Sequence, residues 1–467
     1  MPRLRPVISA AAVALLVAAC AGMSGQTAAP TTGPTAPAAP APAAAAAVAM
    51  PADGLPAPVR EILPNGLTLI IQDHRASDIV AVYLFIKVGL RYDRPDELGY
   101  SHFMEHMLFK GTDTWGPGYF DRAVEGVGGR SNAFTSFDYT TFQIVVPSEA
   151  LDTAVGLLRD QAFRSVFDEK EIERERQVIF EEARIVQDTP KDAIVRQLYH
   201  LVFDDNPYGR PLLGTRATLN SANHERLLRY YKHFYTPENM ELVVVGPVET
   251  KAVRALVDRT FGRVPSHGLL PTPAPVPAPL TAPVREMVER PEQQAQLAIG
   301  WQAPQSSDPA GDALDLVATI LAGSESSRLT RKLRDDERLV RNITMNYAAL
   351  VGGGIVSLRA AAEAKDLPLL ERRIFEEIDR IKESGPTEEE RQQALIKFDA
   401  DHAFDTETSE GLAKAYGTAE TTWTLDAEIH YVDRLRRITL EQIRDAARRY
   451  LSATHYARLA FVPKKSP

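Results

Sequence analysis

Two similar successions of apolar and polar positions occur along the chain, one in each half. In the first half, an apolar run over residues 79–88 predicts a buried strand, and a polar turn leads to a helical pattern over residues 102–109. In the second half, residues 295–301 predict a strand, and a second turn leads to a helical pattern over residues 314–321. The chain is therefore expected to contain a repeated strand-turn-helix unit.

Later in each half, an apolar strand precedes two amphipathic helices. These helices are expected over residues 149–162 and 169–186 in the first half, and over residues 367–383 and 387–404 in the second. Because the order of elements repeats, the sequence predicts a duplicated unit. We expect an α+β fold of two homologous domains, each an antiparallel-rich sheet covered by helices.

Proline and small residues mark the limits of these domains. Residues 265–284 form a Pro-rich stretch that predicts a semi-rigid linker. The two domains are therefore expected over residues 59–264 and 285–463. Residues 21–58 consist mainly of Ala, Pro, Thr and Gly, and they predict a disordered tether because they offer few large apolar groups to a core.

Residues 1–20 have the pattern of a secretory signal. Arg3 and Arg5 precede an apolar run that is short for a membrane span, and the run ends in Val17-Ala18-Ala19-Cys20, which resembles a bacterial lipobox. We expect a lipid anchor on Cys20 in the bacterial periplasm. By the same resemblance, Ala21 favours the outer membrane, because it is not the acidic residue that retains such proteins at the inner membrane. The alternative is an ordinary signal peptide cleaved nearby, with Cys20 incidental.

Composition narrows the classes of function. Of the 467 residues, 44% are hydrophobic and 25% are charged, which predicts a mainly globular chain. The net charge is −9 and there is no long Lys/Arg block, so we expect no nucleic-acid partner. The single cysteine excludes an internal disulfide framework and a cysteine-based zinc site.

The first predicted helix carries the motif His102-Phe103-Met104-Glu105-His106. Residues four apart lie on one helix face, so both imidazoles could bind one zinc ion. Glu105 lies within the same arc, where a carboxylate could accept a proton from water. The order H-x-x-E-H is typical of inverzincin metallopeptidases. The alternative is a buried helix with two hydrogen-bonded histidines and a surface glutamate.

The second predicted helix lacks this motif. When the glycines that follow the two helical patterns, Gly111 and Gly323, are aligned, the positions opposite the histidines and the glutamate are Leu314, Val317 and Ala318. Only the first domain is therefore expected to bind zinc. A catalytic zinc ion needs a third protein ligand. The charged helix offers several glutamates over residues 169–182, and composition alone does not choose among them.

Two stretches closely resemble the pitrilysin/insulinase family of zinc metallopeptidases, in particular its processing-peptidase branch. They are residues 98–112, which contain the motif, and residues 131–140. The resemblance extends over residues 59–463 and is strongest in the first half. It implies two domains that enclose a cavity, one zinc ion per chain, and endopeptidase hydrolysis of peptides or unfolded polypeptide segments.

The resemblance also implies roles for individual residues. Glu105 matches the catalytic base of the family, and Glu175 matches a glutamate that supports the catalytic site. Glu175 lies seven residues before Glu182, so both point from the same helix face. Glu181 points about 100° away and is the poorer candidate for a ligand. The metal ligands would be His102, His106 and Glu182.

The resemblance further implies an edge strand that pairs with the substrate backbone, which would give broad specificity. The segment that begins at Asn132, Ala133 and Phe134 matches it. The alternation of Phe142, Ile144 and Val146 is typical of a half-buried strand. The alternative is a plain core strand.

In the family, the domain without zinc offers an arginine and, seven residues later, a tyrosine that hold substrate carbonyl groups. Arg334 matches the arginine, but Arg341 stands where the tyrosine is expected. We therefore expect a heterodimer with a zinc-less homologous subunit that supplies a complete Arg/Tyr pair. The alternative is that Tyr347 or another group substitutes. A non-catalytic scaffold or a peptide-binding subunit of the same fold are the rival functions.

Overall fold

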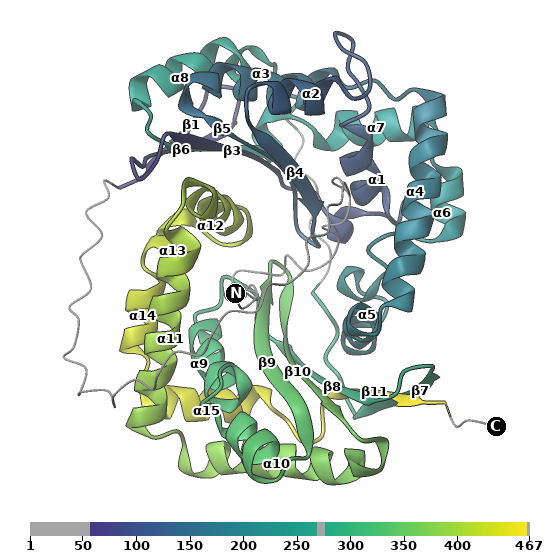
Figure 1. Ribbon diagram of the computed structural model, residues 1–467, viewed down its shortest axis with the longest axis vertical. Coiled ribbons are helices and arrows are strands. Elements are labelled where there is room, and N and C mark those ends of the chain that lie inside the picture. The colour runs from purple at the N-terminus through teal and green to yellow at the C-terminus, as the bar shows by residue number, and fades with distance from the viewer. Residues whose placement is uncertain (1–56, 269–275, 465–467) are drawn as a thin grey trace, which may run out of the picture.

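Two mixed sheets form the framework of the structure, one in each half of the chain (Figure 1). The computed structural model describes residues 57–268 and 276–464. The expected signal over residues 1–20, nearly all of the expected tether over residues 21–58, and residues 269–275 of the expected linker lie outside the described residues.

The first sheet has the strand order β1-β2-β6-β3-β5-β4, and β2 and β6 are its parallel pair. The other neighbouring strands are antiparallel. Strand β3 begins at the predicted residue and ends two residues before the predicted end. The strands are β1 (Val59–Ile62), β2 (Thr68–Asp73), β3 (Ile79–Ile86), β4 (Arg130–Thr135), β5 (Thr140–Pro147) and β6 (Met240–Gly246).

The second sheet repeats the first without its outermost strand. Its order is β7-β11-β8-β10-β9, with β7 and β11 parallel and the other neighbours antiparallel. The order and the relative directions of these five strands are the same as those of β2, β6, β3, β5 and β4 in the first sheet. The predicted α+β fold with two homologous, antiparallel-rich units is therefore confirmed. The strands are β7 (Val284–Arg290), β8 (Ala295–Ala303), β9 (Val340–Leu350), β10 (Gly353–Ala362) and β11 (Ala457–Pro463).

Helices of each half bury one face of the sheet of that half in a large apolar core. In the first half these are α1 (Tyr100–Met107), α2 (Tyr119–Gly126), α3 (Leu151–Arg164), α4 (Glu169–Asp188), α6 (Arg216–Ser221), α7 (His224–Phe234) and α8 (Thr250–Arg259). In the second half these are α9 (Ala310–Ala322), α10 (Leu367–Ser384), α11 (Glu388–Thr406), α14 (Tyr431–Arg437) and α15 (Leu440–Tyr450). Helix α13 (Leu425–Ile429) instead places Leu425 in an apolar cluster on the first sheet. The amphipathic helices predicted from the sequence correspond to α3, α4, α10 and α11.

The opposite face of each sheet is covered by a helix from the other half. Helix α5 (Pro190–Phe203) packs on β8 and β11 of the second sheet, in a cluster that contains Leu198 and Val202. Helix α12 (Ser409–Thr422) packs on the first sheet, in a cluster that contains Phe85 and Leu412. Figure 1 shows α12 against the inner side of the first sheet. This exchange joins the two halves through apolar cores.

Each of these contacts uses a glycine to let helix and strand approach closely. A Cβ atom on Gly417 of α12 would lie 2.0 Å from the ring of Phe85. On the other side, a Cβ atom on Gly300 of β8 would lie 2.8 Å from Val202 of α5. A side chain at either position would force the exchanged helix away from its sheet.

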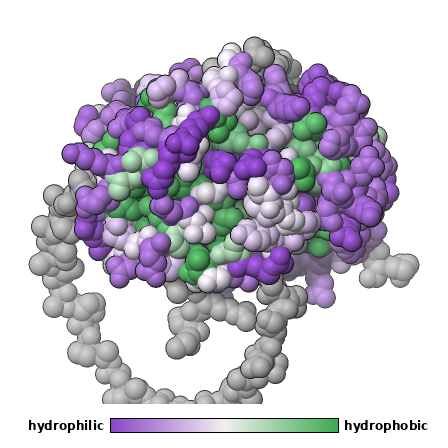
Figure 2. All heavy atoms as spheres, turned by 90° about the horizontal axis from the view of Figure 1, so that it is seen from above, coloured by the Kyte–Doolittle hydropathy of each residue, from purple (hydrophilic) through white to green (hydrophobic). Residues whose placement is uncertain are grey.

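The described surface is polar over much of its area. In the face seen from above, hydrophilic side chains line much of the rim and apolar groups show between them (Figure 2). Large exposed apolar side chains are spread over several elements and include Tyr119 on α2 and Phe404 on α11. Within residues 57–268 and 276–464, every helix falls short of the length and apolar character needed to cross a membrane.

A buried carboxylate lies where α12 meets the first sheet. Glu241 on β6 is fully buried, receives a hydrogen bond from Thr421 of α12 at 2.9 Å, and lies 2.7 Å from the ammonium group of Lys87. Burial raises the pKa of Glu241 to about 7, against the opposing effect of the Lys87 charge. Helix α12 is therefore held partly by a carboxyl group whose pKa is raised toward neutrality.

We expect the stability of the protein to depend on pH through Glu241. Its folded pKa lies above its unfolded value, so the folded state holds more protons between about pH 4.5 and pH 7. The free energy of unfolding of the wild type, relative to that of Glu241→Gln, should therefore fall by about 1–3 kcal/mol as the pH rises through that interval. Urea unfolding of both proteins at several pH values measures this difference. A difference that is constant with pH would contradict the prediction.

Candidate zinc site

The N-terminus of α1 is held by one buried carboxylate. Asp93 accepts hydrogen bonds from the backbone N–H groups of Gly99 and Ser101, from the Ser101 hydroxyl at 2.6 Å, and from the Tyr230 hydroxyl at 2.8 Å. Burial raises the pKa of Asp93 to about 7, although these hydrogen bonds oppose the shift. A negative charge at the start of a helix also matches the helix dipole. Asp93 thus fixes where α1 begins, which is Tyr100 rather than the predicted residue 102.

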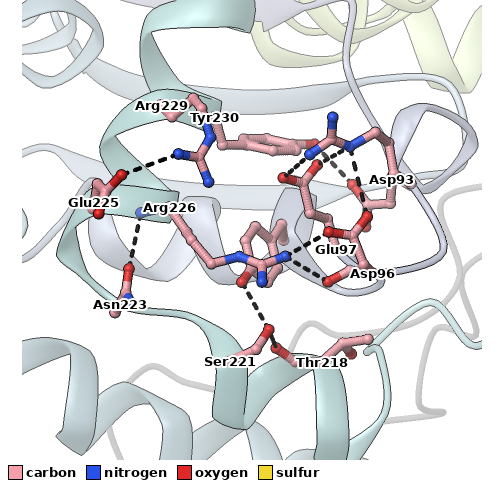
Figure 3. Close-up of polar contacts among 12 residues, drawn as sticks. Asp93, Asp96, Glu97, Thr218, Ser221, Asn223, Glu225, Arg226, Arg229 and Tyr230 are labelled. Carbon is pink, nitrogen blue, oxygen red and sulfur yellow. Dashed lines mark hydrogen bonds and ion pairs between the residues drawn. The ribbon is translucent and has the colours of Figure 1, made fainter.

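Polar contacts from α6 and α7 support the same helix (Figure 3). Arg226 donates to the carboxylate of Asp96 at 2.8 Å, in the turn before α1. The Tyr100 hydroxyl and the Ser221 hydroxyl lie 3.1 Å apart. These contacts join α7 to the turn before α1 and α6 to the first residue of α1, so the start of α1 is held from outside the helix.

The two histidines of the motif point to one place. His102 and His106 lie on consecutive turns of α1, with ring centroids 4.7 Å apart. His102 is 1% exposed, and Glu105 is 8% exposed. The predicted common face of the motif is therefore present, and it is directed into the protein. The alternative of a surface glutamate at position 105 is wrong.

Helix α4 brings two glutamates to the histidines. The Oε2 atom of Glu182 lies 3.7 Å from Nε2 of His102 and 3.5 Å from Nε2 of His106. Seven residues earlier, Glu175 Oε2 lies 2.9 Å from Nδ1 of His106, and its other oxygen lies 2.8 Å from the ammonium group of Lys110. The two glutamates therefore differ in position. Glu182 faces the Nε2 atoms of both histidines, whereas Glu175 contacts Nδ1, on the other side of the His106 ring.

Glu181 lies elsewhere. Its carboxylate is exposed and pairs with Arg184 on the same helix, and this pairing holds the pKa of Glu181 below its ordinary value. Among the described residues, the group of three side chains whose ligand atoms come close enough for a metal ion is His102, His106 and Glu182, with all ligand atoms within 4.8 Å of one another.

These residues fit a zinc ion. Neither ring nitrogen of the buried His102 has a hydrogen-bond partner among the described residues. Burying such groups without partners costs free energy, which a metal ion would recover. Two imidazoles and one carboxylate are a common ligand set of catalytic zinc sites. The hydrogen bond of Glu175 to Nδ1 leaves Nε2 of His106 available as a ligand and orients the ring, as carboxylates behind metal-bound histidines do.

Charges around the site shift the pKa values of its residues. Burial and the neighbouring charges of His106 and Arg196 lower the pKa of His102 well below its ordinary value. Burial also lowers the pKa of His106, but its hydrogen bonds to Glu175 and Glu182 outweigh this and raise the pKa to about 9. For Glu175, burial acts upward, and the hydrogen bonds from His106 and Lys110 bring the pKa below its ordinary value.

Glu105 is oriented by a residue outside the motif. The hydroxyl of Thr135, the last residue of β4, donates to Glu105 Oε2 at 2.6 Å. Burial raises the pKa of Glu105 to about 7, while the charge of His106 and the Thr135 hydrogen bond oppose the shift. A carboxylate with a pKa near neutrality is suited to accept and return a proton.

The strand predicted to bind substrate is only partly where it was expected. Asn132, Ala133 and Phe134 lie on β4, which is the edge strand of the first sheet. The alternating residues Phe142 and Ile144, however, lie on β5, an inner strand that pairs with β3 and β4. The interpretation of that alternation as the edge strand was wrong, because a tight turn after Thr135 divides the segment into a hairpin.

Arg334 is engaged with neighbours of its own. It lies on a short π-helix (Thr330–Asp336), where it pairs with Asp335 and Glu325. Arg341 is exposed on β9. Tyr347 is buried and donates to the carbonyl oxygen of Pro304 at 2.8 Å, so its hydroxyl is occupied. The structure thus gives no support to Tyr347 as a substitute for the expected tyrosine.

Several residues around the site were missed in the sequence. Asp93 was recognised only as part of a turn, and Thr135 and Lys110 were not assigned roles. Arg196 of α5 was not singled out, although its charge acts on His102. Lys110 lies three residues beyond the end of α1, so helical spacing gave no signal for it. The roles of the others depend on contacts between distant segments.

A duplicated α+β fold with one His-His-Glu group at its first half is the architecture of a two-domain zinc peptidase. Residues 68–216 match the family described as "Insulinase (Peptidase family M16)", and residues 221–398, which begin within the first half, match "Peptidase M16 inactive domain". An "Uncharacterized zinc protease" of Rickettsia bellii is 30% identical over 337 residues, which are 72% of this chain and 81% of the relative. The chain belongs to the insulinase family, peptidase family M16.

Other comparisons agree with this assignment. The "Uncharacterized zinc protease YmxG" of Bacillus subtilis is 28% identical over 389 residues, 82% of this chain and 93% of the relative. The crystal structure of a protease from Helicobacter pylori superposes with a TM-score of 0.83 at 23% identity, over 88% of this chain and all of that one. A peptidase M16 inactive domain from Pseudomonas fluorescens gives a TM-score of 0.81 at 16% identity, over 88% of this chain and 99% of that one. These structures share the fold.

Substitutions on α4 test the assignment of the ligands. Glu182→Gln is expected to weaken zinc binding by more than about 100-fold, because it removes a direct ligand, and Glu175→Gln by about 10–100-fold, because it removes only the support of a histidine. Glu181→Gln is the matched control and should bind zinc like the wild type. Competition with a chromophoric chelator measures the affinities. If Glu181→Gln lost zinc and Glu182→Gln retained it, the ligand assignment would be off by one position.

Proposed function

We propose that this protein is a zinc-dependent endopeptidase that hydrolyses peptides or unfolded polypeptide segments, with one zinc ion per chain. The observation that carries the proposal is the approach of His102, His106 and Glu182 to within 4.8 Å, with the buried carboxylate of Glu105 one residue from a ligand. Relatives named zinc proteases support the same class of reaction. A bound zinc ion would supply Lewis-acid polarisation of the scissile carbonyl group and of water.

The residues of the chain supply the proton transfers. Glu105 accepts a proton from the attacking water as the water oxygen bonds to the carbonyl carbon. When the C–N bond breaks, Glu105 returns that proton to the leaving amine nitrogen. Thr135 holds Glu105 Oε2 by its hydrogen bond, so the other carboxylate oxygen is the one directed to the water.

The edge strand β4 gives a reason to expect extended substrates. Its free edge can pair with the main chain of a peptide, and Thr135 at its end contacts the base. A peptide paired along Asn132, Ala133 and Phe134 would therefore run toward Glu105. Main-chain pairing depends on few substrate side chains, which suits unfolded segments of varied sequence.

The base is tested by Glu105→Gln. The amide keeps the size of the side chain but cannot accept the proton, so we expect kcat to fall by about 10²–10⁴ or more. Zinc should be retained, since both histidines and Glu182 are untouched. Peptide turnover and zinc content are measured on the same sample, with Glu181→Gln as the matched control. Near-normal turnover by the zinc-loaded Glu105→Gln protein would rule out this mechanism.

The rival functions predict different measurements. A non-catalytic scaffold of the same fold would bind little zinc, which mass spectrometry of the purified protein detects. A peptide-binding subunit would retain unstructured peptides without cleaving them. Digestion of such peptides with and without a chelator separates both from an enzyme.

We also propose a heterodimer with a zinc-less homologous subunit. A further proposal is a lipid anchor through Cys20, which would hold the protein at a membrane of the bacterial periplasm, with the outer membrane favoured. The heterodimer is supported by the second domain, where Arg334 is engaged by Asp335 and Glu325 and an arginine stands at position 341. The anchor and location are supported by the sequence of residues 1–20.

A partner should raise activity. Addition of a zinc-less homologue that carries the complete Arg/Tyr pair is expected to increase kcat/KM at least tenfold, equivalent to about 1.4 kcal/mol of barrier. The physical reason is that donors to the substrate carbonyl groups lower the barrier only if they are placed correctly. The control is the same partner with both residues replaced by alanine. Full activity of the chain alone, with no gain from the partner, would show that the heterodimer is not needed.

A further inference from the structure

A chain of polar contacts leads away from the candidate zinc site and ends at a lysine. Nδ1 of His106 lies 2.9 Å from Oε2 of Glu175, and Oε1 of the same carboxylate lies 2.8 Å from the ammonium group of Lys110. Lys110 is in the turn that follows α1, where its backbone N–H donates to the carbonyl oxygen of Met107. Each oxygen of Glu175 therefore has a partner, the imidazole ring at one and the ammonium group at the other.

Lys110 is the lysine that this carboxylate depends on. Glu175 is 6% exposed, so water offers its oxygens little alternative to these contacts. The neighbouring arginines of α4 pair with other glutamates of the same helix, in the pairs Arg174–Glu171 and Arg176–Glu173. In the part of the chain that the structure describes, the basic groups paired with Glu175 are thus His106 and Lys110.

A lysine at this place is unfavourable for a cation site on the ground of charge alone. One carboxylate separates its ammonium group from a zinc ligand, and a positive charge so near repels a bound metal ion. The contribution of Lys110 to the site must therefore come from something other than its charge. A glutamate side chain loses rotamer freedom when it is held in one place, and a contact at Oε1 restrains Glu175 before it meets the histidine.

The second half shows that the repeated fold does not require these contacts. The first helices align through Gly111 and Gly323, and α4 aligns with α11 because α5 and α12 begin equally far along the chain from the starts of α4 and α11. Three alanines of the second apolar core correspond to the members of the polar chain: Ala318 to His106, Ala322 to Lys110 and Ala394 to Glu175. The three polar residues are thus missing together from the half that lacks the zinc motif.

We propose that Lys110 is a positioning residue of the zinc site. It holds the carboxylate of Glu175 in the place where that group orients the His106 ring, with Nε2 toward the metal. The inference rests on the zinc site of the proposed function, and it adds to that site a residue that acts only through Glu175.

Zinc affinity separates positioning from charge, because the two effects have opposite signs. Lys110→Met removes the positive charge and keeps most of the length of the side chain. If charge alone mattered, zinc would bind more tightly. We expect the affinity to fall by about three- to tenfold, which is less than the loss expected for Glu175→Gln, because the carboxylate stays and loses only its restraint. Competition with a chromophoric chelator measures the affinity.

A double-mutant cycle assigns the effect to Glu175. In the Glu175→Gln background, Lys110→Met should change the zinc affinity by less than about twofold, because the carboxylate that it positions is already gone. Lys110→Arg keeps a charged donor and should retain most of the affinity that Lys110→Met loses. The matched control is Lys170→Met, which removes an exposed lysine from the first turn of α4 and should bind zinc like the wild type.

A role of Lys110 in folding alone predicts another pattern. Lys110→Met would then lower the thermal unfolding temperature of the metal-free protein and weaken zinc binding equally in the wild-type and Glu175→Gln backgrounds. That result would overturn the inference, and so would an unchanged or tighter affinity of Lys110→Met, or a wild type that binds no zinc. If zinc affinities follow the expected pattern but the wild type cleaves no peptide, Lys110 keeps its role and the peptidase proposal fails. If the wild type binds zinc and cleaves peptides while Lys110→Met binds zinc equally well, only this inference fails.

Discussion

The structure depends on an exchange of helices between its halves. Each sheet has one face covered by its own helices and the other covered by a helix of the opposite half, α5 or α12. Neither half can therefore bury both faces of its sheet alone, and removal of one exchanged helix would expose a row of apolar side chains to water. Because α5 continues directly from α4, the same exchange that joins the halves also anchors the helix bearing Glu175 and Glu182.

The candidate zinc site lies on two helices, α1 and α4, that are both held in place by neighbouring segments. Helix α1 is fixed at its start by Asp93, and α4 is fixed at its end by the turn into α5. The three ligand groups thus converge from two rigid helices rather than from loops, which keeps their geometry precise. The cost is a concentration of buried polar groups, and the raised pKa values of Asp93 and Glu105 show that burial outweighs their hydrogen bonds.

Local patterns in the sequence predicted the bounds of several helices well, but they did not predict which elements pack together. The extents of α3, α4, α10 and α11 followed from hydrophobic periodicity, and the seven-residue spacing of Glu175 and Glu182 correctly placed both on one face. Residues 190–203, which form α5, were not assigned to a helix from the sequence, and no local pattern says which sheet the apolar face of such a helix will meet. The contact of Thr135 with Glu105 likewise joins two different elements, β4 and α1, and is not visible in the sequence. The alternation around Phe142 misled because it predicted a half-buried strand, whereas β5 is an inner strand that is buried on both faces.

A small polar cluster connects the second half to the turn between β4 and β5. Asp138 in this turn lies 2.8 Å from Arg91, accepts a hydrogen bond from Tyr208 at 2.8 Å, and accepts another from the backbone N–H of Val351 in the β9–β10 hairpin. The Tyr208 hydroxyl in turn accepts from the N–H of Gly352. Thr135 lies three residues from Asp138 in the same hairpin. Any rotation that separates the halves must break the bonds to the β9–β10 hairpin, and it would release the turn that steadies Glu105. The contact between the two halves and the orientation of Glu105 thus depend on the same hairpin, β4–β5.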